Sequence, residues 1–90
     1  MLIALIAKDR PDALQLRLDT RDAHIAYIRE TGVVAQAGPL LDAGGQMTGS
    51  LVILDVADMA AASKWAENDP YAKAGLFRSV ELIAWKKVIG

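Results

Sequence analysis

Two short apolar runs restrict the folds open to this chain more than any other feature of its sequence. Residues 2–7 read Leu-Ile-Ala-Leu-Ile-Ala, and residues 51–54 read Leu-Val-Ile-Leu. The first run is too short for a helix and meets a polar turn at 9–12, so it predicts a strand over 2–8. Because successive side chains of a strand point to opposite faces, both runs are apolar on both faces of their sheet. Strands of this kind belong in the centre of a sheet.

The rest of the chain divides into helices and strands at capping and turn residues. A helix is expected over 13–31, in two pieces because Asp-Thr-Arg-Asp at 19–22 can restart it, and Gly32 ends it. The remaining elements are predicted in this order: a strand over 33–40, a loop at 42–45, a strand over 50–56, a helix over 59–67 capped by Asp58, a break at 68–70, a short helix over 71–75 and a last strand over 77–88.

This order, β-α-β-β-α-β, predicts an α+β fold of the ferredoxin-like kind, with one antiparallel sheet and both helices on one of its faces. The strand with Pro39 belongs at an edge, because proline cannot donate to a ladder, and the strand that ends in Lys86 and Lys87 belongs at the other edge. No segment is left to cover the second face of the sheet. We therefore expect a homodimer in which two copies join their sheet faces about a two-fold axis.

Length and composition limit the classes of function. A chain of 90 residues holds one hydrophobic core, so a single domain over 1–90 is expected. A net charge of -1 argues against nucleic-acid binding. The absence of cysteine and the single histidine exclude thiolate chemistry and multi-histidine metal sites within one chain. With no membrane-length apolar run and no signal-peptide pattern, we expect a cytoplasmic protein without membrane association.

His24 is the residue best suited to proton transfer, because histidine is the side chain that normally titrates near neutral pH. It falls on the flank of the helix face that carries Ile25 and Ile28, and Arg21 falls on the same side. A partly exposed helix histidine would also suit this position. Asp69 suits a helix N-cap, yet its carboxylate can equally accept from one imidazole nitrogen and strengthen the other as a base. The pair is therefore a candidate acid–base site.

Other polar positions admit a structural and a functional interpretation. Ser50 can orient a substrate or simply begin a strand, and with the histidine–aspartate pair it completes the inventory of a hydrolytic triad, although no nucleophile-elbow sequence is present. Gly38 and Pro39 form a turn at a strand end or let the backbone approach a ligand closely. Tyr71 is more typical of a packing residue than of a proton donor.

Five stretches of the chain form a pattern when they are taken together. They are Arg-Asp-Ala-His at 21–24, Ala-Gly-Pro-Leu at 37–40, Thr-Gly-Ser at 48–50, Trp-Ala-Glu-Asn-Asp-Pro-Tyr at 65–71 and Trp-Lys-Lys-Val at 85–88. In these stretches the chain resembles the YciI-like (YCII-related) family of small bacterial proteins, and the resemblance spans essentially its whole length. Its most specific part is the Asp-Pro-Tyr stretch combined with Arg-x-x-His.

The resemblance implies a ferredoxin-like subunit that forms a dimeric α/β barrel. It also implies an active-site pair at His24 and Asp69, with Ser50, Gly38 and Pro39 lining the same cleft. Some relatives in the family are linked to the breakdown of chlorinated aromatic compounds, while most have no assigned substrate.

Three functional hypotheses follow. The first is a cofactor-free enzyme of the lyase or isomerase type, in which His24 is general base or acid on a small polar or aromatic metabolite. In it Asp69 orients His24, while Arg21, Ser50 and Tyr71 contact the substrate. The second is a non-catalytic small-molecule-binding or protein-interaction module on the same dimeric cleft. The third and weakest is a haem or metal site that uses the single histidine.

Overall fold

The helices and strands occur in the predicted order. In the computed structural model, which describes residues 1–90, they are β1 (Leu2–Asp9), α1 (Leu14–Thr31), β2 (Val34–Leu41), β3 (Met47–Asp55), α2 (Met59–Asn68), α3 (Pro70–Lys73) and β4 (Phe77–Trp85). All four strands form one sheet, whose order is β2-β3-β1-β4 and whose neighbouring strands are all antiparallel. The fold is therefore the predicted ferredoxin-like α+β arrangement.

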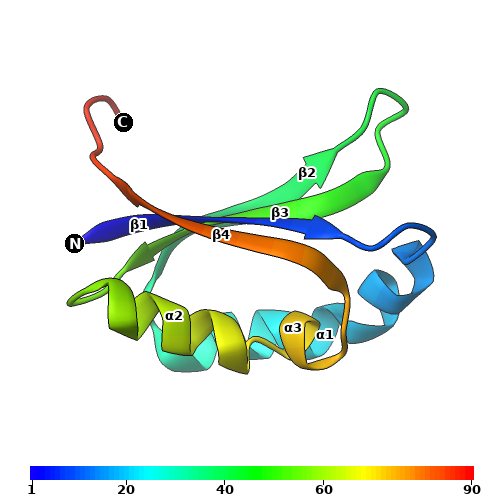
Figure 1. The fold of residues 1–90 in the computed structure, drawn as a ribbon, viewed down its shortest axis with the longest axis horizontal. Helices are drawn as coiled ribbons and strands as arrows, with labels where there is room; N and C mark the ends of the chain where they lie inside the picture. Colours follow the sequence, from blue (N-terminus) through cyan, green and yellow to red (C-terminus); the bar gives the residue numbers. More distant parts are fainter.

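The two apolar strands, β1 and β3, lie in the centre of the sheet, and β2 and β4 lie at its edges, as predicted. Figure 1 shows a sheet layer above a layer that contains all three helices. The helices therefore cover only one face of the sheet. None of them is long and apolar enough to cross a lipid bilayer.

The hydrophobic core lies between the helices and one face of the central strands. Strand pairing places Ile3 opposite Leu54 and Leu5 opposite Val52 on this face, and all four side chains are fully buried. Trp65 of α2 packs against them. Burying an aliphatic side chain of this size contributes about 1.5–3 kcal/mol to stability.

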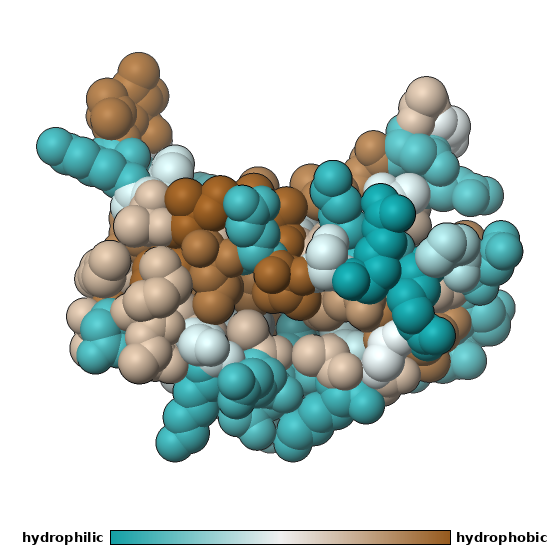
Figure 2. Space-filling model, viewed as in Figure 1, coloured by the Kyte–Doolittle hydropathy of each residue, from teal (hydrophilic) through white to brown (hydrophobic).

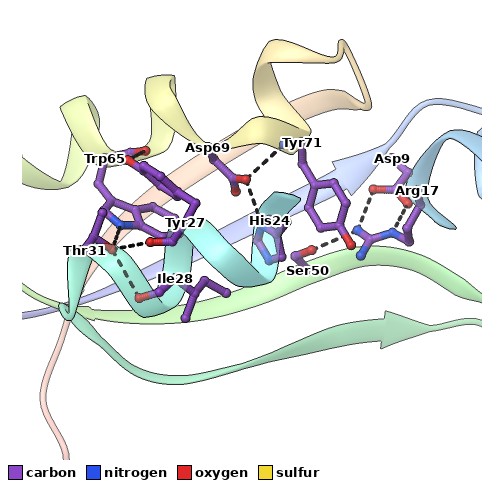
Figure 3. A network of polar contacts seen from close by, with 10 residues as sticks. All are labelled: Asp9, Arg17, His24, Tyr27, Ile28, Thr31, Ser50, Trp65, Asp69 and Tyr71. Atoms are coloured by element: carbon purple, nitrogen blue, oxygen red, sulfur yellow. Dashed lines mark hydrogen bonds and ion pairs between the residues drawn. The ribbon is translucent and has the colours of Figure 1, made fainter. Parts of the chain in front are cut away.

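A polar contact ties α1 to α2 at the end of the helical layer, and it helps to set how the two helices meet. The Trp65 ring donates from Nε1 to Oγ1 of Thr31 over 2.9 Å, and the Tyr27 hydroxyl donates to the Trp65 carbonyl over 2.9 Å. Figure 3 shows this cluster beside the other polar contacts of the helical layer. The contact fixes the spacing of the two helices at the level of Trp65, four residues before Asp69.

The prediction that the first helix would break into two pieces is wrong, because α1 is continuous from Leu14 to Thr31. The expected restart residues use their side chains within the helix. The Thr20 hydroxyl donates to the Leu16 carbonyl over 2.8 Å, and Gln15 donates to the Asp19 carboxylate over 2.8 Å. These bonds replace the capping contacts that a new helix start would need.

Two strand boundaries also differ from the predictions, and strand pairing explains both. The last strand ends at Trp85 rather than at residue 88, because Trp85 pairs with Leu2, the first residue of β1. Beyond it, residues 86–90 form a C-terminal arm that rises from the sheet (Figure 1). The third strand begins at Met47 rather than at residue 50, because Met47 pairs with Leu41 across the hairpin.

The caps of the second helical segment agree with the predictions. The Asp58 carboxylate accepts from the Ala61 backbone N–H over 2.8 Å at the start of α2. The Asp69 carboxylate accepts from the Tyr71 backbone N–H over 3.0 Å, and Pro70 takes the first position of α3. Gly32 ends α1 at φ +65°, a left-handed conformation that suits glycine.

The face of the sheet that the helices leave free is apolar. Leu51, Ile83 and Trp85 point from it and are between 39% and 43% exposed. Val88 and Ile89 of the C-terminal arm are more than four-fifths exposed. Figure 2 shows hydrophobic residues over the sheet layer and the arm, while the helical layer below is mainly hydrophilic. The two-sided apolar pattern of β1 and β3 therefore leaves a large uncovered apolar surface on one chain.

Candidate active site

Helix α1 buries polar side chains where most helices bury apolar ones. Its only fully buried residues are Arg17 and His24, which lie two turns apart on the same face. An unpaired buried charge costs several kcal/mol, so each of these residues needs a partner. Both find a carboxylate from another element of the fold.

The partner of His24 is Asp69, at the junction of α2 and α3. The Nδ1 atom of His24 lies 2.7 Å from Oδ1 of Asp69, and both side chains are buried. The same oxygen accepts the Tyr71 backbone N–H, so Asp69 serves as helix cap and as partner of His24 at once. The predicted contact is confirmed. The interpretation of His24 as a partly exposed helix residue is wrong.

Tyr71 holds the other side of the His24 ring. The two rings stack with their centroids 4.0 Å apart and an angle of 21° between their planes. Burial raises the pKa of the Tyr71 phenol, although the positive charges of Arg17 and Arg21 act in the opposite direction. Tyr71 thus packs against the His24 ring, and its phenol stays protonated at neutral pH.

The partner of Arg17 is Asp9, at the end of β1. Arg17 donates from Nε and Nη2 to the two carboxylate oxygens over 2.7 and 2.9 Å, in the bidentate geometry that suits a guanidinium. Burial lowers the pKa of Arg17, but the hydrogen bonds and charge of Asp9 outweigh it and raise the pKa above its usual value. Arg17 is therefore a permanent cation that its own carboxylate neutralises.

Ser50 of β3 joins this second pair. Its Oγ accepts a hydrogen bond from Nη2 of Arg17 over 2.8 Å. The preceding residue must be glycine, because a Cβ at Gly49 would collide with the carbonyl oxygen of Ala7 on the neighbouring strand. Figure 3 shows the Ser50 hydroxyl between the Arg17 guanidinium and the His24 ring.

A cavity of about 240 Å³ lies between α1, β2 and β3. Six predicted site residues line it: Arg21, His24, Gly38, Pro39, Ser50 and Tyr71. Arg17 and the apolar side chains of Ile25, Ile28, Ala37, Met47 and Val52 complete the lining. Asp69 lies behind His24 and does not line the cavity. The structure therefore brings every predicted site residue to one place.

The buried polar side chains of the whole chain gather at this cavity. Arg17, His24 and Ser50 line it, and Asp69 supports His24 from behind. Three larger surface grooves lie elsewhere: one beside the β1–α1 turn, one between α1 and α2, and one along β2 and β3. None of them is lined by any of these four residues. A choice of site by cavity volume alone would therefore select a groove that none of the four buried polar residues lines.

Sequence reasoning missed Arg17 and Asp9. A signal for Arg17 was present, because Arg17, Arg21 and His24 follow one another at four and three residues and so share a helix face. Asp9 gave no signal, because its position in a polar turn is equally typical of a solvent-exposed residue. Only the contact between the end of β1 and α1 shows that Asp9 is the ion-pair partner of Arg17.

The structure also bears on two other interpretations. Ser50 bonds to Arg17 and makes no hydrogen bond to His24, so the three residues do not form a connected hydrolytic triad. No group of three or more His, Asp or Glu side chains has the arrangement of a metal site. The polar groups at the cavity are the Arg17–Asp9 ion pair, the hydrogen-bonded His24 and Asp69, the Ser50 hydroxyl, the Tyr71 phenol and the Arg21 guanidinium.

A ferredoxin-like subunit with a histidine–carboxylate pair beside a small cavity defines a class of compact α+β proteins. Within that class the chain belongs to the YCII-related family, because the family model for the YCII-related domain matches residues 1–86. Protein YciI from Escherichia coli O6:H1 is 37% identical over 97 aligned positions, which cover 98% of this chain and 99% of that protein.

Solved structures resemble the chain as well. The 5-chloro-2-hydroxyhydroquinone dehydrochlorinase of Burkholderia phenoliruptrix, in complex with 2,5-dihydroxybenzoquinone, superimposes with a TM-score of 0.89 at 38% identity, and the match covers 96% of this chain and 94% of that one. The Rv0793 protein of Mycobacterium tuberculosis shares the fold alone, with a TM-score of 0.65 at 17% identity over the whole of both chains.

Proposed function

We propose that the chain is a small cofactor-free enzyme that uses His24 for general acid–base chemistry on a ring-sized hydroxylated metabolite. One observation carries the proposal: the buried polar side chains of the chain all gather at one cavity. Buried ion pairs contribute little net stability, so their concentration at a single cavity favours a chemical role.

The orientation of His24 supports its role as the base. The Asp69 carboxylate accepts from Nδ1–H, so the lone pair of the neutral ring is on Nε2, the nitrogen left for the cavity. When Nε2 takes a proton, the negative charge of Asp69 stabilises the imidazolium that forms. Tyr71 stacks on the ring and limits its rotation. In this proposal His24 is the catalytic residue, and Asp69 is a positioning residue.

The cavity also indicates the kind of substrate. Its volume of about 240 Å³ holds a single ring with a few substituents. Ile25, Ile28 and Val52 supply apolar walls, and Arg21 supplies a guanidinium that forms no ion pair within the chain. We expect a ring that carries hydroxyl or carbonyl oxygens, one of them anionic and bound to Arg21. A dehydrochlorinase of hydroxylated rings, at 38% identity, supports this class.

The chemistry that suits the site is an elimination or an isomerisation. In the loss of HCl from a chlorinated hydroxylated ring, a base takes a proton and the C–Cl bonding electrons leave with chloride. Such a step needs proton transfer and stabilisation of negative charge, and it consumes no oxidant or reductant. General acid–base catalysis contributes about 10²–10⁴-fold to such reactions.

The test is a substrate screen with matched variants. Hydroxylated and chlorinated single-ring compounds, with 5-chloro-2-hydroxyhydroquinone among them, would be followed by chloride release and ultraviolet absorbance. His24→Asn should lower kcat by at least about 10²-fold on any compound that the wild type converts. Arg29→Gln, which changes an exposed residue on the same helix, should keep the wild-type rate.

The alternative is that the cavity binds a small molecule without converting it. Arg21 is exposed at the cavity, as a recognition residue would be. Compounds that bind the wild type but are never turned over would favour this alternative. An unchanged rate in His24→Asn would also overturn the enzymatic proposal.

The proposal includes a homodimer that joins the free sheet faces. The apolar face around Leu51, Ile83 and Trp85, with the exposed Val88 and Ile89 of the C-terminal arm, is the surface that a second copy would cover. Exposed apolar surface of this extent marks an interaction site. In a two-fold dimer the same surface of each subunit contacts the other, so this face would be covered without any further segment of the chain.

A further inference from the structure

The C-terminal arm, residues 86–90, is held only weakly by the rest of the fold. No backbone hydrogen bond joins it to another part of the chain. Val88 and Ile89 are 83% and 90% exposed, more than any other large hydrophobic side chain of the molecule. A hollow of about 130 Å³ also lies between the arm and the end of the sheet beneath it. Two adjacent aliphatic residues that their own chain leaves uncovered indicate a contact with another molecule.

The arm points to the side of the sheet on which a second copy is expected. Figure 1 shows the arm and the β2–β3 hairpin rising from opposite ends of the sheet, both away from the helices. The five residues 86–90, fully extended, reach about 16–18 Å, whereas two packed sheets lie about 10 Å apart. If two copies join their free faces, the arm is therefore long enough to reach the sheet of the partner. This step rests on the homodimer of the proposed function.

A groove on the free face of the sheet suits an aliphatic arm. This β2 groove has a volume of about 480 Å³ and is lined by residues 36–40 of β2 with Leu51 and Ile53 of β3. The opposite edge of the same face suits the arm less, because β4 carries Glu81 there, and Glu81 has no ion-pair partner within the chain. An aliphatic segment laid on Glu81 would remove water from an unpaired carboxylate, which is costly.

The β2 groove shares a wall with the cavity that His24 lines. Ala37, Gly38 and Pro39 line both the groove and the cavity, which lie on opposite faces of the sheet. Because Gly38 has no side chain, this wall is only one backbone thick. A Cβ at Gly38 would meet no atom within 4 Å, so a single chain leaves the wall unsupported at this point.

We propose that in the homodimer the C-terminal arm of each copy lies in the β2 groove of the other copy and supports the wall of that copy's cavity. Val88 and Ile89 fill the groove, while Lys86 and Lys87 remain in water at its rim. Each cavity is thus completed by the partner subunit, and a single chain holds an incomplete one. Val88 and Ile89 touch neither the substrate nor His24, so they are positioning residues.

Disulfide cross-linking tests where the arm lies, because the chain has no cysteine of its own. The double variant Ile89→Cys, Gly38→Cys should form, on mild oxidation, a covalent species of twice the mass of one chain on a denaturing gel, and a reductant should reverse it. The matched control Ile89→Cys, Lys64→Cys places the second thiol at an exposed position of α2 and should stay at the mass of one chain. Either cysteine alone at position 89 or 38 should do the same, because the two arms lie in separate grooves.

Four results of these measurements would overturn the proposal. A disulfide that closes within one chain would place the arm on its own sheet. Cross-linking of Ile89→Cys alone would place the two arms against each other. A dimeric wild type whose double variant gives no covalent dimer would keep the homodimer and exclude the arm contact. A monomeric wild type would overturn the homodimer and the arm contact together.

Removal of the arm's aliphatic side chains should also weaken the dimer. Val88→Ser combined with Ile89→Ser should raise the dissociation constant of the dimer at least about tenfold, because two buried aliphatic side chains leave the interface. Leu18→Ser, which changes an exposed leucine of α1 in the helical layer, should leave the constant within about twofold of the wild type. Equal dissociation constants for the arm variant and Leu18→Ser would contradict the arm contact.

Mixed dimers test whether the arm completes the cavity of the partner. The variant with serine at positions 88 and 89 keeps His24 but lacks the aliphatic arm, whereas His24→Asn keeps the arm. When the two are mixed at concentrations at which both are dimeric, some dimers hold one cavity with both His24 and a partner's intact arm. Chloride release from 5-chloro-2-hydroxyhydroquinone by the mixture should then exceed the mean of the two variants measured separately. A rate equal to that mean would overturn the role of the arm in the cavity, whereas a wild type that releases no chloride would overturn the enzymatic function alone, since the cross-link needs no turnover.

Discussion

The Nδ1 atom of His24 lies 2.7 Å from Oδ1 of Asp69, although the two residues are 45 positions apart in the chain. The contact joins α1 to the junction of α2 and α3, and the same carboxylate oxygen also caps α3. Asp69 therefore caps α3 and holds the His24 ring, and different substitutions at this position can separate the two effects.

Asp69→Asn and Asp69→Ala should differ in stability. Asparagine keeps an oxygen that can accept from the Tyr71 N–H, whereas alanine removes the cap and leaves the His24 ring without its buried acceptor. We expect Asp69→Ala to lose about 2–4 kcal/mol in urea unfolding and Asp69→Asn clearly less.

Asp69→Asn should nevertheless change the chemistry of His24. A carboxylate accepts only, so it keeps the proton of the neutral ring on Nδ1, whereas an amide can also donate and allows both tautomers. Nitrogen NMR of the single histidine should show the Nδ1–H form in the wild type and a mixture in the variant. Identical tautomers together with an identical rate would show that Asp69 is a cap and nothing more.

The oligomeric state can be tested with two variants of one strand. Ile83 and Val80 of β4 are each 43% exposed, but Ile83 lies on the free face of the sheet and Val80 on the helix-covered face. Sedimentation of the wild type at micromolar concentration should give twice the mass of one chain. Ile83→Asp should yield monomers or aggregates, because it buries a charge in the contact, while Val80→Asp should remain dimeric. A monomeric wild type contradicts the sheet-to-sheet dimer.

Gly49 should tolerate no side chain. An alanine Cβ there would collide with the Ala7 carbonyl oxygen, so β3 or β1 must move. We expect Gly49→Ala to lower the free energy of unfolding by about 1–3 kcal/mol, as overpacking usually does. Gly38→Ala is the matched control, because a Cβ at Gly38 meets no atom within 4 Å. Equal thermal stability of the two variants would contradict the close approach of β1 to Gly49.

Stability should fall at alkaline pH through the tyrosines. Burial raises the pKa of both Tyr27 and Tyr71 above the usual value of about 10. The folded state then holds these phenolic protons more tightly than the unfolded chain. Their contribution to stability is therefore complete below about pH 10 and is lost as the pH rises through the folded-state pKa.

The measurement combines absorbance with urea unfolding. Phenolate absorbance of the folded wild type should rise only above about pH 10, and Tyr71→Phe should make the alkaline loss of stability less steep. Tyr71→Phe keeps the ring that stacks on His24, so the fold is retained. Tyrosines that ionise in the folded protein at or below the usual pH would contradict this prediction.

Much of the fold could be predicted because it depends on local patterns. The two-sided apolar runs at 2–7 and 51–54 identified the central strands, and Pro39 identified an edge. The errors lie where pairing overrides local signals. The last strand stops at Trp85 because its neighbour begins at Leu2, and α1 runs through its expected break because side chains there bond within the helix.

For the site, the sequence by itself determined which chemistry was available. With one histidine and no cysteine, His24 was the candidate for proton transfer, and the motif around Asp69 indicated its partner. Only the tertiary structure decided that β1 meets α1 so that Asp9 holds Arg17 and Arg17 reaches Ser50. The physical reason is that a charged side chain such as Asp9 can be buried only beside a partner of opposite charge. The packing of the sheet against α1, which depends on strand register and not on any single segment, brings Arg17 to it.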